Sequence, residues 1–584
     1  MRRIPRETRD SERGAARKDP GGRLSVALIW PGTYSAGMSS LGFLSVYSLI
    51  NSDPGGLCER FFLPQGEERA LSRERGRPLG DFGLIAGSLS FENDYHLFLR
   101  ILKAGRVPVE AKDRDERIFP APVVAGGIGV WSNPFPLAPF ADLILTGEGE
   151  LSWPVILDLH GDREFGRLRK TEKISVLAAN VPGALAPSLC PELFDEEAGF
   201  DSFARALARF KPVVPPRLSF KKGDAGICSE SFEHPPNSPI FAKDAEFSGT
   251  RLIEISRGCP YGCRFCLAGS LYRPHRFWDG PRILKAIDAP NPWDGLNPFP
   301  DDAPVGLVSP AVADHPDLNY VVSRILEKKR KISFSSLRLS ALTEETARLF
   351  SEGKLAGLAV APEGGTERIR RTMNKDITEE EILSAVKLLS RVSLRKLKLY
   401  FMLGLPGETD EDVRGIAELA EKIRKASFGK SRAPLISASV ANFTPKPHTP
   451  FEDVPSLSFR ELARRGELLK TLMKRAKGVE LRLDSPWFSL VQDVLGRSGP
   501  NGASFLRELL KNDGKAKASL KAWNHEGREE ETSSWRALRP WRIVAPPTGV
   551  DWLEREKENG AAGIFSPACP GALSCGRCEA CPKV

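Results

Sequence analysis

Three cysteines stand close together near the middle of the chain, at a spacing that could hold a metal cluster. Cys259, Cys263 and Cys266 lie in the run RGCPYGCRFC, with three and then two residues between them. Structural zinc usually takes four protein ligands, commonly as two separated pairs. Three thiolates can instead bind three irons of a [4Fe–4S] cluster and leave the fourth iron open to an outside ligand. An open position is typical of a catalytic metal, so the run predicts a catalytic iron–sulfur site.

A second group of cysteines lies near the C-terminus. Cys569, Cys575, Cys578 and Cys581 fall within 13 residues, and Pro582 follows them. The C-x₂-C-x₂-C-P run is similar to ferredoxin loops, whereas four thiolates also satisfy tetrahedral zinc. We expect metal here, as an auxiliary iron–sulfur cluster or as zinc, with free thiols at a frayed end as the alternative.

Length and composition bound the rest of the chain. With 584 residues the chain is too long for one hydrophobic core, which predicts three or four domains. No stretch reaches the ~18 consecutive apolar residues of a membrane span, and the charged opening residues lack the apolar core of a secretory signal. We therefore expect a cytoplasmic protein with no membrane partner. The net charge of +9 permits an anionic partner but does not require one.

Short apolar runs alternate with helix-sized segments in the first part of the chain. Strands are expected at residues 24–30, 82–88, 123–126 and 142–146, with a helix at 39–51. This alternation indicates a parallel sheet, and so a flavodoxin-like α/β domain over 21–160 after a disordered charged tail over 1–20. Its ligand crevice should lie beyond the carboxyl ends of the strands. The glycine-rich turns at 126–129 and 147–150 are either plain tight turns or places where backbone approaches a cofactor or a neighbouring domain.

A second series of alternating strands and helices follows a connector over 161–245. Its six expected strands are residues 252–256, 305–309, 332–339, 357–362, 398–406 and 436–443. Six βα units predict a partial (βα)₆ barrel over 246–455, with its active site at the carboxyl ends of the strands.

No strand is expected beyond Pro455. A mostly helical C-terminal region is expected over 456–560, followed by a metal-binding cysteine tail over 561–584. The helix expected at 459–477 carries many Arg and Lys residues, which could face RNA or simply form a solvated surface.

The cysteine run resembles the C-x₃-C-x-aromatic-C loop of radical SAM enzymes, which also follows the first strand of a partial (βα)₆ barrel. Residues 361–368 (APEGGTER) resemble the PE-x-G element after that family's fourth strand, and 404–409 (GLPGET) its fifth-strand element. Residues 443–451 (FTPKPHTPF) are similar to the sixth-strand segment of an uncharacterised subgroup. That subgroup has a cobalamin-binding-domain-like N-terminal region and a C-terminal cysteine cluster, and the similarity covers most of the chain.

The resemblance implies an enzyme in which the three central cysteines hold a [4Fe–4S] cluster that binds S-adenosylmethionine (SAM). A reductant such as a flavodoxin or ferredoxin would supply one electron. Reductive cleavage of SAM would then give a 5′-deoxyadenosyl radical that takes a hydrogen atom from an unknown substrate. No catalytic acid or base is assigned, although His448 is a possible one.

The resemblance also suggests cofactor contacts. Phe265 would lie against the adenine, Glu363 would accept from the ribose or the methionine ammonium, and Arg338 would bind the methionine carboxylate or the substrate. Ser309 stands where many relatives have Gly-Gly-Glu, so the usual ammonium contact departs from the pattern. The remaining candidate cofactor-binding residues are Gly364, Gly365 and Leu405.

Three functions remain open from the sequence. Cobalamin in the N-terminal domain would make methyl transfer the leading reaction, although residues 31–42 lack the histidine of the usual cobalt-binding motif. Modification of tRNA or another RNA is the alternative within enzymes. A non-catalytic scaffold with two structural zinc sites is the alternative of another class.

Overall fold

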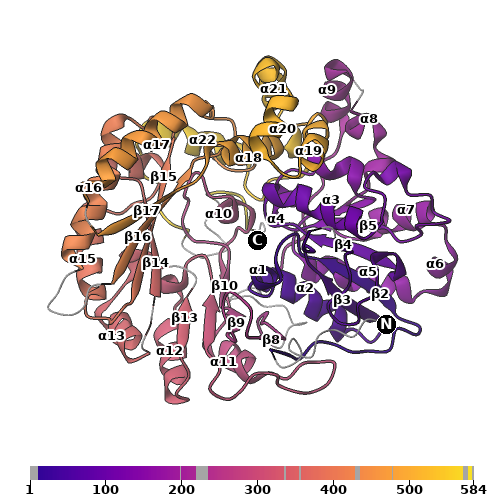
Figure 1. Cartoon of the computed structure of the whole chain (residues 1–584), viewed down its shortest axis with the longest axis horizontal. Helices are drawn as coiled ribbons and strands as arrows, with labels where there is room; N and C mark the ends of the chain where they lie inside the picture. The colour runs from indigo at the N-terminus through magenta and orange to yellow at the C-terminus, as the bar shows by residue number, and fades with distance from the viewer. Residues whose placement is uncertain are drawn as a thin grey trace.

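The computed structural model describes residues 11–66, 68–196, 199–218, 234–334, 337–353, 355, 357–427, 434–476, 478–569 and 577–581. An N-terminal α/β unit and a curved parallel-stranded unit lie side by side, and the C-terminal helices extend over both (Figure 1). The predicted α/β class, with a flavodoxin-like sheet, a partial barrel of parallel strands and a mostly helical C-terminal region, is confirmed.

The N-terminal unit is built on a six-stranded sheet. Its strands in spatial order are β3 (Gly56–Phe61), β2 (Leu24–Ile29), β4 (Leu84–Ser88), β5 (Val123–Gly126), β6 (Leu143–Leu145) and β7 (Ala184–Leu185). The first five are parallel, and only the pairing of β6 with β7 is antiparallel. Taken in chain order, those five strands have the 2-1-3-4-5 arrangement of flavodoxin-like sheets. The helices of this unit include α2 (Leu41–Ser52), α3 (Tyr95–Ala104), α5 (Gly149–Gly161) and α7 (Lys170–Asn180).

Strand β3 is absent from the sequence prediction because it carries buried charge. Glu59 and Arg60 are both fully buried. Arg60 pairs with Glu74 at 2.6 Å and with Glu12 at 2.8 Å. Buried charges are tolerated only when paired, and both partners are distant in sequence.

The ion pair between Arg60 and Glu12 also corrects the prediction of a disordered tail over 1–20. Residues 1–10 lie outside the described residues, but β1 (Glu12–Arg13) pairs with β8 (Phe241–Ala242) and so belongs to the fold. The connector differs as well, because α7 and strand β7 extend the N-terminal unit beyond residue 160. Helices α6 (Arg163–Arg167), α8 (Pro191–Phe194) and α9 (Phe200–Arg209) complete this region.

The second unit contains two parallel sheets that form the barrel wall. One consists of β9 (Arg251–Glu254), β12 (Val305–Val308) and β13 (Ile332–Phe334). The other consists of β14 (Gly357–Glu363), β15 (Lys396–Leu403), β16 (Leu435–Asn442) and β17 (Val479–Leu483). A parallel bridge between Leu337 and Val360 joins the two sheets. The helices after successive strands are α11 (Gly280–Asp288), α12 (Leu318–Glu327), α13 (Glu344–Glu352), α15 (Glu379–Leu389), α16 (Asp410–Ala426) and α17 (Phe459–Met473).

The expectation that no strand follows Pro455 is wrong. Strand β17 continues the barrel wall in parallel with β16. Its residues alternate between partly buried Val479, Leu481 and Leu483 and exposed Glu480 and Arg482, which is the period of a half-buried strand.

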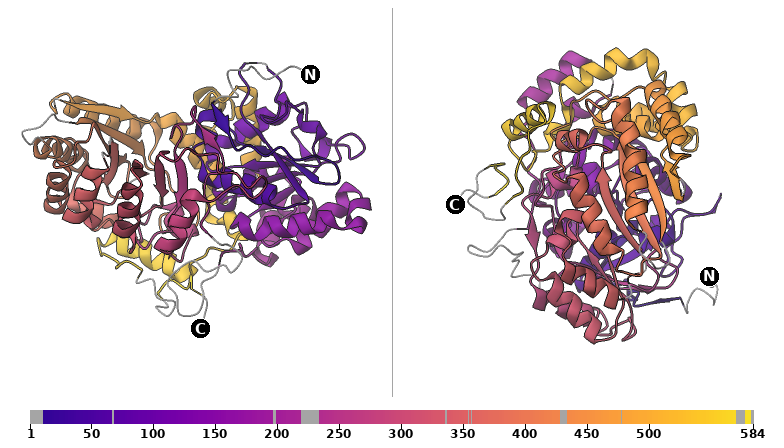
Figure 2. Two further views of the ribbon diagram at one scale, coloured as in Figure 1. Left: turned by 90° about the horizontal axis from the view of Figure 1, so that it is seen from below. Right: turned by 90° about the vertical axis from the view of Figure 1, so that its left-hand side faces the viewer.

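The C-terminal helices share their hydrophobic core with the N-terminal unit. They are α18 (Pro486–Arg497), α19 (Gly502–Lys511), α20 (Ala516–Ala522), α21 (Glu529–Ala537) and α22 (Val550–Ala561). Leu495, Phe505 and Trp523 pack in one buried cluster with Phe98 and Trp131 of the N-terminal unit. The last, yellow part of the chain lies against the middle of the molecule (Figure 2). Among the described residues, no helix has the length and apolar character needed to cross a bilayer.

Candidate functional site

The three central cysteines lie in a loop, the cluster loop (residues 258–266), at the carboxyl end of the first barrel strand. It follows the short strand β10 (Ser256–Arg257), which pairs with β11 (Arg276–Phe277), and it leads into α10 (Leu267–Leu271). Gly258 has φ of +76°, and a Cβ there would lie 2.2 Å from the Tyr272 carbonyl oxygen. Cys266 Sγ accepts a hydrogen bond from Gly269 N at 3.3 Å. The loop therefore starts at a position that only glycine fits.

The thiols of the cluster loop lie in surroundings that disfavour a negative charge. Burial, and then the neighbouring thiols, raise the pKa of Cys259 to about 12 and that of Cys266 to about 11. Since metal ligands must be thiolates, a bound cation has to supply the missing charge. In the described part of the chain, no three His, Cys, Asp or Glu side chains are grouped as ligands of one metal ion. Three thiols from one loop are the donor set that a [4Fe–4S] cluster with an open iron requires.

Two polar side chains tie the cluster loop to neighbouring segments, one from within the loop and one from outside it. The buried guanidinium of Arg264 donates to the carbonyl oxygens of Arg371 and Thr372, both at 3.0 Å. It also pairs with Glu556 at 3.1 Å. Asn374 Nδ2 donates to the Gly262 carbonyl at 3.1 Å. These bonds, which are charge-assisted at Arg264, connect the loop to neighbouring segments, so the loop is preorganised.

The structure brings two of the predicted cofactor residues together. Phe265 packs against a small buried apolar cluster that contains Leu405, beside the cluster loop. Glu363 ends β14 with φ of +66°, and its carboxylate pairs with Lys375 at 3.5 Å. Position 365 requires glycine, because a Cβ there would lie 2.2 Å from Ile416 N of α16. A Cβ at Gly364 would lie 2.5 Å from the side chain of Ile369.

Ser309 and Arg338 are held by other parts of the protein. The Ser309 hydroxyl lies 2.5 Å from Ser256 Oγ and accepts from Ala311 N at 2.9 Å. The guanidinium carbon of Arg338 lies 3.5 Å from the centre of the ring of Tyr261, which is a residue of the cluster loop. Its Nε donates to Ser340 Oγ at 2.8 Å.

Two residues near the cluster loop were not found from the sequence. Asp314 follows β12, and its carboxylate accepts from the Tyr261 hydroxyl. Arg273 is 5% exposed, and it donates to the carbonyl oxygens of Gly269 and Tyr261, both at 3.0 Å. Neither lies in a motif, and only their positions in the loops around the cysteines could have singled them out.

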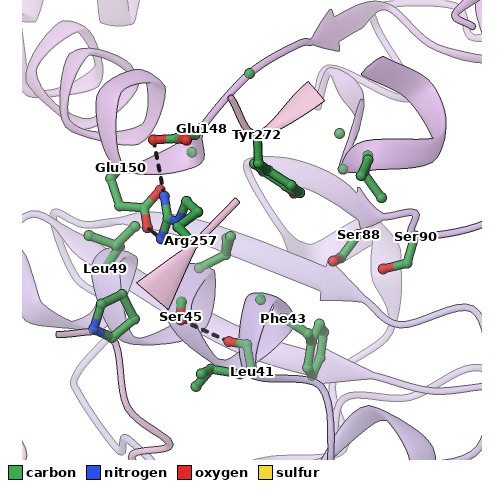
Figure 3. Close-up of a pocket in the computed structure, with 18 of the residues that line it drawn as sticks. Leu41, Phe43, Ser45, Leu49, Ser88, Ser90, Glu148, Glu150, Arg257 and Tyr272 are labelled. Atoms are coloured by element: carbon green, nitrogen blue, oxygen red, sulfur yellow. Dashed lines mark hydrogen bonds and ion pairs between the residues drawn. The ribbon is translucent and has the colours of Figure 1, made fainter. Parts of the chain in front are cut away.

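A cavity of about 330 Å³ lies between the two units. From the N-terminal unit it is lined by the carboxyl ends of β4, β5 and β6 and by helix α2, and from the barrel by Arg257, Gly258 and Ser309 (Figure 3). Open α/β sheets bind ligands at this edge.

Both glycine-rich turns, at 126–129 and 147–150, lie at this cavity. Gly127 and Gly147 both have positive φ. A Cβ at Gly127 would lie 2.4 Å from Leu89 O, and a Cβ at Gly147 would lie 2.4 Å from Pro216 Cδ. These glycines permit close packing within the protein.

One wall of the cavity is charged. Arg257 pairs with Glu150 at 2.5 Å, Glu254 at 2.8 Å and Glu148 at 3.1 Å (Figure 3). Arg276 pairs with Glu148 at 2.5 Å. Burial acts to raise the pKa of Glu148, but the two guanidinium groups outweigh burial and lower it. Burial raises the pKa of Glu254 despite its pairing with Arg257.

The C-terminal cysteine segment packs on the back of the cluster loop. Cys569 N donates to the Pro260 carbonyl at 2.7 Å, and Arg273 Nη1 lies 3.7 Å from Cys578 Sγ. Arg217 donates to the carbonyl oxygens of Arg273 at 2.8 Å and of Ala580 at 3.5 Å. Cys575 lies outside the described residues. Two buried or half-buried guanidinium groups therefore lie beside the described part of this segment.

Comparison with known proteins finds a matching family for each of the two α/β units. The family described as "Radical SAM proteins, N-terminal" matches residues 42–187, and the "Radical SAM superfamily" matches residues 253–420. The uncharacterized protein MJ0966 of Methanocaldococcus jannaschii is 28% identical over 518 residues, which are 88% of this chain and 98% of that protein. The uncharacterized methyltransferase PH0819 of Pyrococcus horikoshii is 24% identical over 54% of this chain and 60% of its own length.

The similar solved structures include one that is matched over almost its whole length. It is the radical S-adenosylmethionine methyltransferase TsrM from Kitasatospora setae, with cobalamin and a [4Fe–4S] cluster bound. The similarity covers 88% of this chain and 99% of TsrM, with a TM-score of 0.50 and 14% sequence identity. At this identity the comparison shows a shared fold.

Proposed function

The chain belongs to the radical SAM superfamily and is an enzyme of that superfamily, and from this premise we propose that it is a cobalamin-dependent methyltransferase. The observation that carries the proposal is the position of the cavity between the units. It lies at the ligand-binding edge of a flavodoxin-like sheet and at the same time touches Gly258, the first residue of the cluster loop. A cofactor held there would lie next to the SAM-binding cluster.

Cys259, Cys263 and Cys266 would hold the [4Fe–4S] cluster, which when bound supplies the electron that cleaves SAM. The chain's own groups would bind and orient SAM for this cleavage. The apolar cluster around Leu405 supports Phe265, whose ring would lie against the adenine. Glu363 and Arg338 remain the proposed polar contacts, and their partners Lys375 and Tyr261 hold them beside the loop.

The lining of the cavity fits part of a cobalamin molecule. About 330 Å³ is at the lower end of ligand pockets and encloses a nucleotide-sized group, with the rest of a larger cofactor outside. Small residues such as Gly42, Ser45 and Ser88 leave room, and a Cβ at Gly42 would meet nothing within 4 Å. None of the lining residues is histidine, so this lining offers no imidazole to cobalt. When bound, cobalamin supplies a carrier for the methyl group.

The C-terminal cysteines support a second metal group, which we assign as an iron–sulfur cluster rather than zinc. Arg273 and Arg217 place positive charge beside Cys578 and the backbone of Ala580. Neighbouring cations favour thiolates and stabilise an anionic cluster. An external low-potential protein such as a flavodoxin or ferredoxin would supply the electrons. Cys575, the fourth proposed ligand, lies outside the described residues.

RNA modification is less well supported. The basic helix α17 uses Arg464 to pair with Asp410 at 2.7 Å and Arg465 to pair with Glu408 at 2.7 Å. Two of the cations on which the RNA alternative depends are therefore already neutralised. The proposed substrate is accordingly a small molecule of unassigned structure.

The experiment uses anaerobically reconstituted protein with hydroxocobalamin, dithionite and SAM that carries a deuterated methyl group. We expect about eight irons per chain, the absorption bands of bound cobalamin and dithionite-dependent formation of 5′-deoxyadenosine and S-adenosylhomocysteine. A Cys259/Cys263/Cys266→Ala triple variant should keep about four irons and lose both products, while the control Cys190→Ala should keep everything. Iron and 5′-deoxyadenosine without cobalamin would overturn methyl transfer and leave a simpler radical SAM enzyme. A colourless zinc protein would overturn the whole proposal.

A further inference from the structure

A second cavity, of about 480 Å³, lies among the C-terminal helices. Helices α18 and α21 form two of its walls, and residues 453–458, which lead into α17, form another. None of the residues that line it also lines the cavity between the two units, so it is a separate site. The proposed methyl transfer does not use it.

Three buried polar atoms in the lining of this cavity have no hydrogen-bond partner among the described residues. They are Thr532 Oγ1, Arg536 Nε one turn further along α21, and Nδ1 of His525, which lies between α20 and α21. Thr532 is only 3% exposed. Buried polar atoms of folded proteins are almost always hydrogen-bonded, so each exception needs an explanation. A guanidinium Nε can only donate and a hydroxyl can donate, so the missing partner is a hydrogen-bond acceptor.

The charges around these atoms suit an acceptor that is negatively charged. Asp493 of α18 pairs with both Arg497 and Arg536 at 2.5 Å, so two guanidinium groups face one carboxylate. Burial acts to raise the pKa of Asp493, but the two guanidinium groups outweigh burial and lower it. Asp453, which also lines the cavity, pairs with Arg539 at 2.6 Å. Both carboxylates therefore have their cations, and the second guanidinium at Asp493 remains to attract an anion.

We propose that this cavity binds the phosphate group of a small phosphorylated molecule, with Thr532 Oγ1 and Arg536 Nε as donors to the phosphate oxygens. Guanidinium groups are well suited to phosphate, and hydrogen bonds to a charged acceptor are the strong ones. His525 Nδ1 adds a third donor when it carries the proton. The site goes beyond the proposed function, because none of these residues takes part in the binding of SAM or cobalamin.

The rest of the lining fits a phosphate ester. Ser458 and Ser533 add hydroxyl groups, and Leu457 and Leu490 add apolar surface for an organic group. A volume of about 480 Å³ is within the usual range of small-molecule sites, which combine an apolar lining with a few polar groups that orient the ligand. The cavity therefore has room for more than an inorganic ion.

The test measures binding of inorganic phosphate and of glycerol 3-phosphate to the full-length, iron-loaded protein by titration calorimetry at constant ionic strength. Wild type should bind both saturably. Thr532→Val keeps the shape of the side chain without its hydroxyl and should weaken both ligands about tenfold. Because this hydroxyl has no partner among the described residues, the unfolding temperature without phosphate should not fall. Arg536→Met leaves Arg497 as the cation of Asp493, so it should fold and also lose at least tenfold in affinity.

Ser534 provides the matched control. It lies on the exposed side of α21, and its hydroxyl donates to the Glu530 carbonyl oxygen at 3.0 Å, so Ser534→Ala should leave both affinities unchanged. Wild-type protein that binds neither ligand saturably would overturn the inference, and so would variants at Thr532 and Arg536 that bind as wild type does. A lower unfolding temperature of Thr532→Val together with unchanged phosphate affinity would assign the hydroxyl to an ordered water instead. Binding of phosphate without glycerol 3-phosphate would refute a phosphate ester as the ligand.

Discussion

Arg257 forms a 2.5 Å ion pair with Glu150 and in this way ties the cluster loop to the N-terminal unit. Arg257 precedes Gly258 directly, whereas Glu150 stands in the first turn of α5, beyond the carboxyl end of β6. Glu148 of the same turn pairs with both Arg257 and Arg276. The cavity therefore has one wall that both units build, and the geometry of the cluster loop depends on the N-terminal sheet.

Loss of Arg257 should destabilise the protein strongly. Arg257→Met would leave Glu150 and Glu254 without their cation in a buried site, and breaking such pairs costs about 3–5 kcal/mol. A denaturant titration, followed by tryptophan fluorescence, should show this loss together with lower iron content. Arg324→Met is the control, because Arg324 and Glu327 form an exposed pair for which less than about 1 kcal/mol is expected. Equal effects of the two substitutions would contradict a structural role for the interface.

The local features of this protein were predictable, and those that depend on distant partners were not. The spacing of Cys259, Cys263 and Cys266 is visible in the sequence, and so are the strands whose residues are uniformly apolar. Strand β3 was hidden because Arg60 is acceptable inside the protein only with Glu12 and Glu74, which the chain brings from elsewhere. Asp314 could not be identified either, since only the fold brings its carboxylate next to the Tyr261 hydroxyl.

Gly258→Ala should abolish assembly of the central cluster. The new Cβ would lie 2.2 Å from the Tyr272 carbonyl, and the backbone has φ of +76°, so the loop must shift. Gly295→Ala is a matched control, because Gly295 has φ of +68° but a Cβ there would meet nothing within 4 Å. We expect iron analysis after reconstitution to fall by about four irons in the first variant and to remain unchanged in the second. Full iron in Gly258→Ala would mean that the loop tolerates displacement.

A bulky side chain at Gly42 should block cobalamin without affecting the cluster. Gly42 lies on α2 at the cavity, and a Cβ there has open space around it, so Gly42→Leu extends into the cavity without a backbone clash. The expected result is loss of bound cobalamin in absorption spectra, with iron content and 5′-deoxyadenosine formation preserved. Gly161→Leu serves as control, since a Cβ at this exposed end of α5 also meets nothing within 4 Å. Unchanged cobalamin binding in Gly42→Leu would place that cofactor elsewhere.

His448 should make stability depend on pH in the acidic range. The side chain is fully buried, and its Nε2 donates to the Ser132 carbonyl at 3.1 Å, while Nδ1 has no partner among the described residues. Burial lowers the pKa of His448 to about 4. The unfolded chain, with a pKa near 6.5, therefore takes up a proton before the folded protein does. The contribution of His448 to the free energy of unfolding is complete above pH 6.5 and is lost as the pH falls toward 4.

Comparison with His448→Asn isolates this contribution, because Asn tolerates the residue's φ of +60°. Denaturant titrations of both proteins at pH 7.5 and pH 5 give the difference in unfolding free energy at each pH. The advantage of wild type should shrink by about 2 kcal/mol between the two values, since about 1.5 pH units below the unfolded pKa are involved. Other titrating groups cancel because both proteins contain them. A difference that stays constant would mean that His448 has the same pKa in the folded protein as in the unfolded chain, and a difference that grows as the pH falls would mean that the folded protein holds His448 protonated beside Glu452.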